Sequence, residues 1–141
     1  MAWGRSQSGR IHLQQAIRMS SARSSTLPRC ARGEIWWAEL SPTVGHEQSG
    51  RRPVLIVSAD RFNVGHYNMV MVLPLTTRLR GWPTRIRIDP PEGGVNLPSE
   101  IQGDQLRALD LQRLTQRLGP AISPATMQSV DRVLRVILNL P

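Results

Sequence analysis

Short, β-rich segments separated by glycine- and proline-containing turns follow one another from residue 33 to 106, and this pattern constrains the fold most. Residues 53–58 form a continuous apolar run of strand length, typical of a central strand that is buried on both faces. Proline has no amide donor, so we expect Pro53 at the first position of that strand. Residues 84–88 alternate arginine and isoleucine, which indicates a strand with one exposed face. Further strands are predicted at 33–40, at 68–75 and from about 99 to 106.

The C-terminal segment has helical periodicity instead. Ser123 followed by Pro124 is typical of a helix N-cap and the first helical position. A shorter helix is predicted from Asp110 through Arg117. Short strands followed by a closing helix predict a small α+β barrel. The apolar face of the last helix is predicted to contain Met127, Val130, Leu134, Ile137 and Leu138.

Charge is distributed unevenly along the chain. All 18 basic residues are arginines, and six of them lie in residues 1–32, where there is no acidic residue. The remainder carries twelve arginines against ten acids, so net charge alone does not predict that the folded part binds nucleic acid. We therefore divide the chain into a basic N-terminal segment, 1–31, and a single domain, 32–141.

The N-terminal segment lacks the apolar stretch of a secretory signal peptide, and its amphipathic pattern is weak for a transit peptide. A biased terminal segment of this kind is usually disordered. Met19 also offers an alternative start of translation shortly before the domain. A basic arm that grips RNA is the other interpretation, and we favour the disordered tail or the upstream translation.

Cysteine and histidine usage argues against a metal site. Cys30 is the only cysteine, so no internal disulfide can form and a reducing cytoplasm is the simplest compartment. The three histidines, His12, His46 and His66, are scattered without the spacing of zinc ligands. The sequence also contains no run of about 18 apolar residues that would span a bilayer. We expect a cytoplasmic protein with no metal, no cofactor and no membrane partner.

Several motifs in a fixed order carry a family resemblance. They are RGEIWWAEL at 32–40, GHEQSGRRPVLIVS at 45–58, PLTT at 74–77 and DQLR at 104–107, together with Asn63. In these motifs the chain resembles the MazF/PemK family of toxins, over essentially all of the predicted domain. The resemblance implies an SH3-like antiparallel β-barrel with a C-terminal helix, of the CcdB/PemK-like superfamily, and usually a homodimer.

The resemblance also implies a function, that of a sequence-specific endoribonuclease toxin of a toxin–antitoxin system. Members of the family cut single-stranded RNA such as mRNA without a metal ion, by attack of the 2′-hydroxyl, and leave a 2′,3′-cyclic phosphate. Their usual partner is a small MazE-like antitoxin whose C-terminal segment occupies the RNA groove. The catalytic arginine of the family corresponds to Arg52, and the catalytic threonine corresponds to Thr76. Many relatives carry serine in place of His46, and relatives that differ in this loop often recognise different RNA sequences. The resemblance therefore does not predict which RNA sequence this chain recognises.

The residue types fit RNA cleavage without metal. The Arg52 guanidinium can donate two hydrogen bonds to one phosphate and keeps its charge, and Thr76 can donate from its hydroxyl. Neither is a ready proton acceptor, so His46 and Glu47, in the same loop as Arg52, are the candidates for acid–base catalysis. Residue type alone also allows ordinary structural roles, such as a surface ion pair between Arg52 and Glu47 or a strand end at Thr76.

A second set of residues is predicted to bind RNA. Arginines surround Trp82, a mixture that binds phosphates and stacks bases but also forms ordinary solvated strand faces. Asp104 and Gln105 can pair with exposed base edges or hydrogen-bond inside the barrel. Trp36 and Trp37 point to opposite faces of one strand, so we assign one to the core and the other to the dimer surface or the RNA groove. The predicted RNA-binding residues are Gln48, Thr77, Arg78, Trp82, Asp104, Gln105 and Arg107.

Two other functions stay open at this point. A barrel of this kind can act as a non-enzymatic, CcdB-like toxin that binds a protein, or as an RNA-binding barrel without cleavage. The presence of both Arg52 and Thr76 favours the endoribonuclease.

Overall fold

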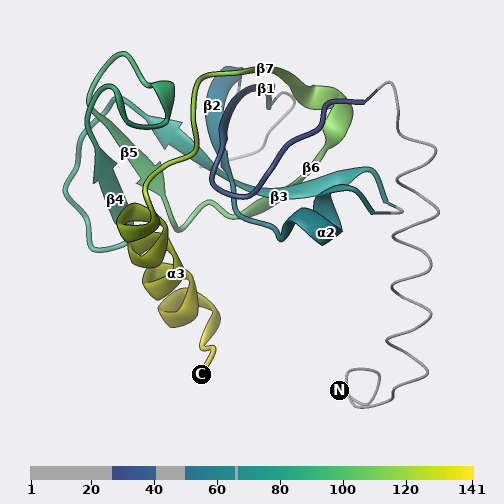
Figure 1. The fold of residues 1–141 in the computed structure, drawn as a ribbon. Coiled ribbons are helices and arrows are strands. Elements are labelled where there is room, and N and C mark those ends of the chain that lie inside the picture. Colours follow the sequence, from purple (N-terminus) through teal and green to yellow (C-terminus); the bar gives the residue numbers. More distant parts are fainter. Residues whose placement is uncertain (1–26, 41–49, 66) are drawn as a thin grey trace.

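A computed structural model of the chain describes residues 27–40, 50–65 and 67–141. These residues form an antiparallel sheet with one longer helix at the C-terminus (Figure 1). The strands are β1 (Ile35–Glu39), β2 (Arg51–Ile56), β3 (Met69–Thr76), β4 (Arg85–Ile88), β5 (Ser99–Gln102), β6 (Arg107–Asp110) and β7 (Leu114–Arg117). The helices are α2 (Asp60–Asn63) and α3 (Pro124–Leu138), with short 3-10 helices η2 (Glu92–Gly94) and η3 (Leu111–Arg113).

Strand β3 organises the sheet. The neighbouring strands run β4-β5-β3-β2-β1-β7, and β6 also pairs with β3. The first half of β3 pairs with β6 and its end pairs with β5, both antiparallel. Because β4 and β7 stand at the two ends of this path, the sheet is an open SH3-like arrangement. The antiparallel, SH3-like fold with a C-terminal helix is confirmed, whereas full closure into a barrel is wrong.

The sheet is buried on both faces. Successive residues of a strand point to opposite sides, so β2 contributes Leu55 to one apolar cluster and Val54 and Ile56 to the other. The first cluster lies under α3 and includes Val130, which is fully buried. The second lies on the other side of the central strands and includes Ala38. The prediction of a central strand after residue 53 is therefore confirmed.

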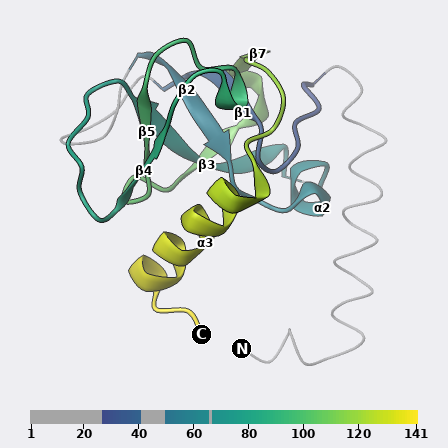
Figure 2. The same ribbon diagram turned by 60° about the vertical axis from the view of Figure 1, so that its left-hand side comes forward.

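Helix α3 begins as its sequence predicts. The Ser123 hydroxyl accepts a hydrogen bond from the Thr126 amide at 3.2 Å, with proline at the first helical position. Of the predicted apolar face, Met127, Val130 and Leu134 pack in or against the first cluster. The last part of the face, Ile137 and Leu138, is 41% and 47% exposed, because the end of α3 extends past the strands (Figures 1 and 2).

The predicted helix from Asp110 through Arg117 is wrong beyond its first turn. The Asp110 carboxylate accepts a hydrogen bond from the Gln112 amide at 2.8 Å, as a cap would. Only the short η3 follows, and the chain then continues as β7, in which Leu114 pairs with Ala38 of β1. Burial of Leu114 and pairing with the open edge of β1 outweigh the local capping signal.

Two strand predictions also need correction. The strand expected from 99 to 106 ends at Gln102, and the chain turns and re-enters the sheet as β6. Pro53 is the third residue of β2 and not the first. The Ile56 amide donates to Glu34 on the β1 side, so by alternation the nitrogen of Pro53 faces β3. Proline is tolerated there because the pairing of β2 with β3 begins only at Val54.

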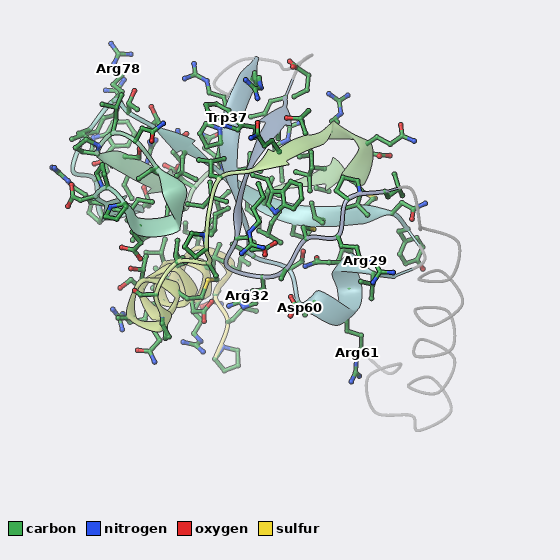
Figure 3. All side chains as sticks on the ribbon, turned by 45° about the horizontal axis from the view of Figure 1, so that its top comes forward. Arg29, Arg32, Trp37, Asp60, Arg61 and Arg78 are labelled. Carbon is green, nitrogen blue, oxygen red and sulfur yellow. The ribbon has the colours of Figure 1, made fainter. Side chains whose placement is uncertain are left out.

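The N-terminal part of the predicted tail, residues 1–26, lies outside the described residues. Leu27 and Cys30 pack in or against the second cluster. Arg32 then fixes the chain to both helices. Its amide donates to Asp60 in α2 at 2.6 Å (Figure 3). Its guanidinium pairs with Asp131 in α3 at 2.5 Å. Whether the domain begins at residue 32 stays a prediction.

Within the three described segments, we find no helix whose length and apolar character suffice to cross a membrane.

Candidate active site

The two predicted catalytic side chains come from neighbouring strands. Val54 of β2 lies opposite Pro74 of β3. Continuing that register by two residues brings Arg52 level with Thr76. Both residues line one cavity of about 200 Å³, together with Trp37. The fold therefore brings Arg52 and Thr76 to one cavity, at the ends of two paired strands.

The Thr76 hydroxyl has a defined orientation. Its oxygen accepts a hydrogen bond from the Arg78 amide at 3.1 Å. A hydroxyl that accepts such a bond can still donate its own proton. Thr76 can thus present a donor toward a ligand in the cavity beside Arg52.

A second cavity, of about 290 Å³, adjoins the first at Thr76 and lies under the loop after β3. The Trp82 ring stands at this cavity, 45% exposed, with the guanidinium carbons of Arg80 and Arg85 at 4.9 and 4.7 Å from its centroid. This arrangement combines a stacking surface with positive charge, as in grooves that bind single-stranded nucleic acids. Four predicted RNA-binding residues line this cavity: Arg78, Trp82, Asp104 and Gln105.

Polar side chains that are shielded from solvent also line the second cavity. Gln102 is 2% exposed, and the Arg85 side chain is 6% exposed. Asp104 accepts a hydrogen bond from the Thr84 hydroxyl at 3.1 Å, and its other oxygen lies 3.4 Å from Arg85 Nε. Neither the Gln102 Oε1 atom nor Arg85 Nε has a hydrogen-bond partner among the described residues. Two residues that line the cavity, Gln102 and Arg85, therefore each carry a buried polar atom without a hydrogen bond.

The loop that carries Trp82 is held by a buried carboxylate. Glu100, in β5, is 3% exposed and accepts hydrogen bonds from the amides of Arg80 and Gly81 at 3.0 and 2.8 Å. Burial by itself would raise the pKa of Glu100. The two amides and the nearby guanidinium charges of Arg85 and Arg87 outweigh burial and lower this pKa below its ordinary value. Glu100 is therefore ionised at neutral pH and positions the loop.

A third cavity, of about 380 Å³, adjoins the cavity that Arg52 lines. It shares Trp37 and Thr77 with the cavity that contains Arg52. The Arg51 guanidinium carbon lies 4.6 Å from the centroid of the Trp37 ring. Trp36, its neighbour in sequence, packs against the second cluster instead. The prediction that one of the two tryptophans packs in the core is confirmed. Trp37 lines two of the cavities, at the same end of the molecule as Arg78 (Figure 3), and its contact with RNA or with a second copy stays a prediction.

Not every predicted residue reaches these cavities. Arg107 lies in β6 opposite Val72, its Nη1 atom is buried, and it lines none of the three. His46, Glu47 and Gln48 lie outside the described residues, so their roles stay predictions. Over residues 27–40, 50–65 and 67–141, no three His, Cys, Asp or Glu side chains are grouped as they would be to hold a metal ion.

Sequence reasoning missed Gln102 altogether and noticed Arg85 only as part of a basic stretch. Only the structure marks out Gln102, because it shows that every residue of the segment 99–102 is buried. A buried glutamine needs a partner, but burial at this position follows from pairing with β3 and β4, which sequence spacing does not reveal.

Comparison with known proteins agrees with this geometry. The family model described as PemK-like, MazF-like toxin of type II toxin–antitoxin system matches residues 31–138. Endoribonuclease EndoA of Bacillus subtilis (strain 168) is 35% identical over 114 residues, which cover 77% of this chain and 94% of that protein. Among solved structures, MazF from Deinococcus radiodurans superposes with a TM-score of 0.68 at 28% identity, over 82% of this chain and 99% of that one.

A mycobacterial endoribonuclease, solved in complex with its cognate antitoxin, superposes with a TM-score of 0.66 at 29% identity, over 79% of this chain and 97% of that one. The family match covers more than half of the sequence and includes every described strand. The chain therefore belongs to the PemK-like, MazF-like family of type II toxins.

Proposed function

We propose that this chain is a sequence-specific endoribonuclease toxin that cleaves single-stranded RNA such as mRNA. The observation that carries the proposal is the shared cavity of Arg52 and Thr76. This cavity and the two that adjoin it, together called the groove, contain two tryptophans, Trp37 and Trp82, each with an arginine stacked on its ring. Such side chains bind the bases and phosphates of an unpaired strand.

The cleavage we propose uses the RNA's own 2′-hydroxyl. The 2′-oxygen forms a bond to the adjacent phosphorus and loses its proton, while the bond from phosphorus to the 5′-oxygen breaks and that oxygen gains a proton. The products are a 2′,3′-cyclic phosphate and a free 5′-hydroxyl. Negative charge accumulates on the non-bridging oxygens, where the Arg52 guanidinium would bind in a bidentate manner and the Thr76 hydroxyl would donate one more hydrogen bond.

The groups that accept and return the proton are proposed from sequence alone. An arginine, with a pKa of about 12 or more, is a poor base. His46 and Glu47 belong to the segment directly before β2, close in sequence to Arg52, and either suits the task. The dependence of cleavage rate on pH tests this for His46. If wild type and His46→Gln give superimposable profiles, His46 takes no part in proton transfer.

Two partners follow from the family. We propose that a small MazE-like antitoxin binds the chain and covers the RNA groove, and that both act in the cytoplasm, where mRNA is present.

We also propose a homodimer. Its support is a set of exposed apolar side chains at the C-terminal end of the chain, which a second copy would cover. These side chains are Val136, Ile137, Leu138 and Leu140.

The test of the proposed activity is incubation of purified protein with mixed RNA in EDTA. We expect discrete fragments that end in a cyclic phosphate, as read by mass spectrometry. Arg52→Ala should lower the cleavage rate by about 10²–10³-fold, the usual cost of losing one donor to the developing charge. Arg61→Ala is the matched control, since Arg61 is an exposed arginine at the other end of the molecule (Figure 3).

The same experiment can overturn the proposal. If wild type and Arg52→Ala produce identical fragments, the cleavage comes from a contaminant or from another site. If the wild type produces none, the chain does not cleave RNA, and binding to RNA or to a protein target becomes the function to test.

A further inference from the structure

We propose that the cavity beneath Trp82 binds one guanine base of the RNA, and that Gln102, Arg85 and Asp104 read its Watson–Crick edge. This inference rests on the proposed function, because it names a base that the groove selects. It assigns specificity to two residues, Gln102 and Arg85, that family motifs and sequence patterns did not single out.

The first argument is the polar atoms that lack partners. Gln102 and Arg85 line the same cavity, and each has a buried atom, Oε1 and Nε, without a hydrogen-bond partner among the described residues. The Arg85 Nε atom has only the Asp104 carboxylate nearby, at 3.4 Å. A buried polar group without a partner costs about 1–3 kcal/mol, so proteins rarely keep one without a use. A ligand in the cavity that carries a complementary donor and acceptor satisfies both atoms when the two side chains turn toward it.

The second argument is the shape and position of the cavity. Its volume of about 290 Å³ admits a single base. Trp82 is partly exposed, and a base can stack on its ring by displacing the exposed Arg80 guanidinium that lies over it. Thr76 lines this cavity and also the one that contains Arg52, so a base bound here belongs to a nucleotide next to the phosphate that is cut.

The third argument is the pattern of donors and acceptors. Three groups of the cavity can address the edge of a base: Gln102 Oε1 and the Asp104 carboxylate accept hydrogen bonds, and Arg85 donates them. Arg78 and Arg80 also line the cavity and add positive charge that suits a phosphate. Guanine presents two adjacent donors, the N1–H and the 2-amino group, beside the O6 acceptor. Adenine and cytosine present one amino group beside ring acceptors, and uracil presents a single N–H. Guanine is therefore the base that uses all three protein groups at once.

Binding of short oligonucleotides tests the inference without requiring cleavage. The probes are single-stranded deoxyribonucleotides, which lack the 2′-hydroxyl and cannot be cut by the proposed reaction. In otherwise identical oligonucleotides, one position is guanine, adenine or hypoxanthine, the base that lacks the 2-amino group. We expect the guanine probe to bind roughly 10- to 100-fold more tightly than the adenine probe, the range typical of one specific base contact. The hypoxanthine probe should fall between them.

Two variants assign the preference to this cavity. Gln102→Leu and Asp104→Asn should each lower the ratio of guanine to adenine affinity toward one. Gln112→Leu, at an exposed glutamine outside the three cavities, should leave the ratio unchanged. Leucine resembles glutamine in size and removes an unsatisfied acceptor, so Gln102→Leu should melt at or above the temperature of the wild type. Asp104 is exposed, so its variant tests the inference even if Gln102→Leu misfolds.

The outcomes separate this inference from the proposed function. Equal binding of the probes, undetectable binding of any of them, or a preference that survives both variants, overturns the guanine site whether or not RNA is cut. A guanine preference that both variants abolish, in a protein that does not cleave RNA, supports the site and overturns the endoribonuclease.

Discussion

Glu100 binds the backbone of Gly81: its carboxylate accepts the Gly81 amide at 2.8 Å and the amide of the preceding residue, Arg80, at 3.0 Å. Gly81 has φ of 69°, a left-handed conformation that glycine adopts without strain. The chain thus turns sharply over a buried charge. The arginine and tryptophan side chains of this loop reach the groove because the turn beneath them is fixed.

Replacing Glu100 with glutamine should loosen this loop. The amide oxygen of glutamine can accept one of the two backbone hydrogen bonds, but its NH₂ group faces the other backbone N–H. We expect Glu100→Gln to lower the free energy of unfolding by about 1–3 kcal/mol, the cost of leaving a buried donor unpaired. Urea denaturation measures this, with Glu39→Gln, at an exposed glutamate, as the control. Equal stability of Glu100→Gln and wild type would show that the carboxylate does not hold the turn.

The same carboxylate makes stability depend on pH. The folded state lowers the pKa of Glu100, so its stabilising contribution is complete above the unfolded pKa, about 4.3, and is lost as the pH falls through the folded pKa. The difference in unfolding free energy between wild type and Glu100→Gln should therefore be constant from pH 7 to 5 and shrink below pH 4. If the difference in unfolding free energy were as large at pH 2 as at pH 7, folding would not lower the pKa of Glu100.

The fold could be predicted from sequence where one segment determines its own structure. The apolar run after Pro53 and the Ser123–Pro124 helix start both appear as expected. The segment 111–117 was misread because its fate depends on β1, which is far away in sequence and supplies an open edge. The prediction of a closed barrel is wrong for a similar reason, because closure depends on whether the two end strands, β4 and β7, pair with each other.

The site could be predicted only in part. Arg52 and Thr76 follow from family motifs, and the structure brings them to one cavity. Their catalytic roles stay predictions. Gln102 was missed because a glutamine in a polar stretch gives no sign of burial until the partner strands are known. Arg107, which the motif assigns to RNA, lines none of the three cavities, and its role stays a prediction.

The ion pair between Arg32 and Asp131 should contribute little by itself. The two side chains are 34% and 31% exposed, so solvent screens the attraction and a coupling of at most about 1 kcal/mol is expected. Arg32→Ala should cost more than Asp131→Asn, because the Arg32 guanidinium also donates to the Val57 carbonyl. A double-mutant cycle in urea measures the coupling. Equal losses from the two single variants would show that the carbonyl contact contributes nothing.

Cys30 should be unreactive in the folded protein. Burial, followed by the nearby Glu34 carboxylate, raises the pKa of its thiol from 9.0 to about 12. The reactive thiolate is therefore scarce at pH 8, and the second cluster limits access. Alkylation by iodoacetamide at pH 8 should be at least about 100-fold slower in the native state than in guanidinium chloride. Similar rates in both conditions would mean that the segment around Cys30 opens readily.

Gly103 should tolerate no side chain, although its φ is not in the left-handed region. A Cβ atom there would lie 2.6 Å from the Thr84 carbonyl oxygen and 2.6 Å from Cγ1 of Val133 in α3. We expect Gly103→Ala to destabilise the protein by about 1–3 kcal/mol, the usual cost of overpacking. Because Gly103 also donates to the Thr84 carbonyl at 2.9 Å, the strain falls on the turn between Gln102 and Asp104. Gly103→Ala should therefore also lower the preference for guanine over adenine, because Gln102 and Asp104 flank the strained residue.

Val133→Ala removes one of the two close contacts. In that background, Gly103→Ala should therefore lower the free energy of unfolding by less than it does in the wild type. An equal cost in both backgrounds would assign the whole effect to the backbone contact with Thr84.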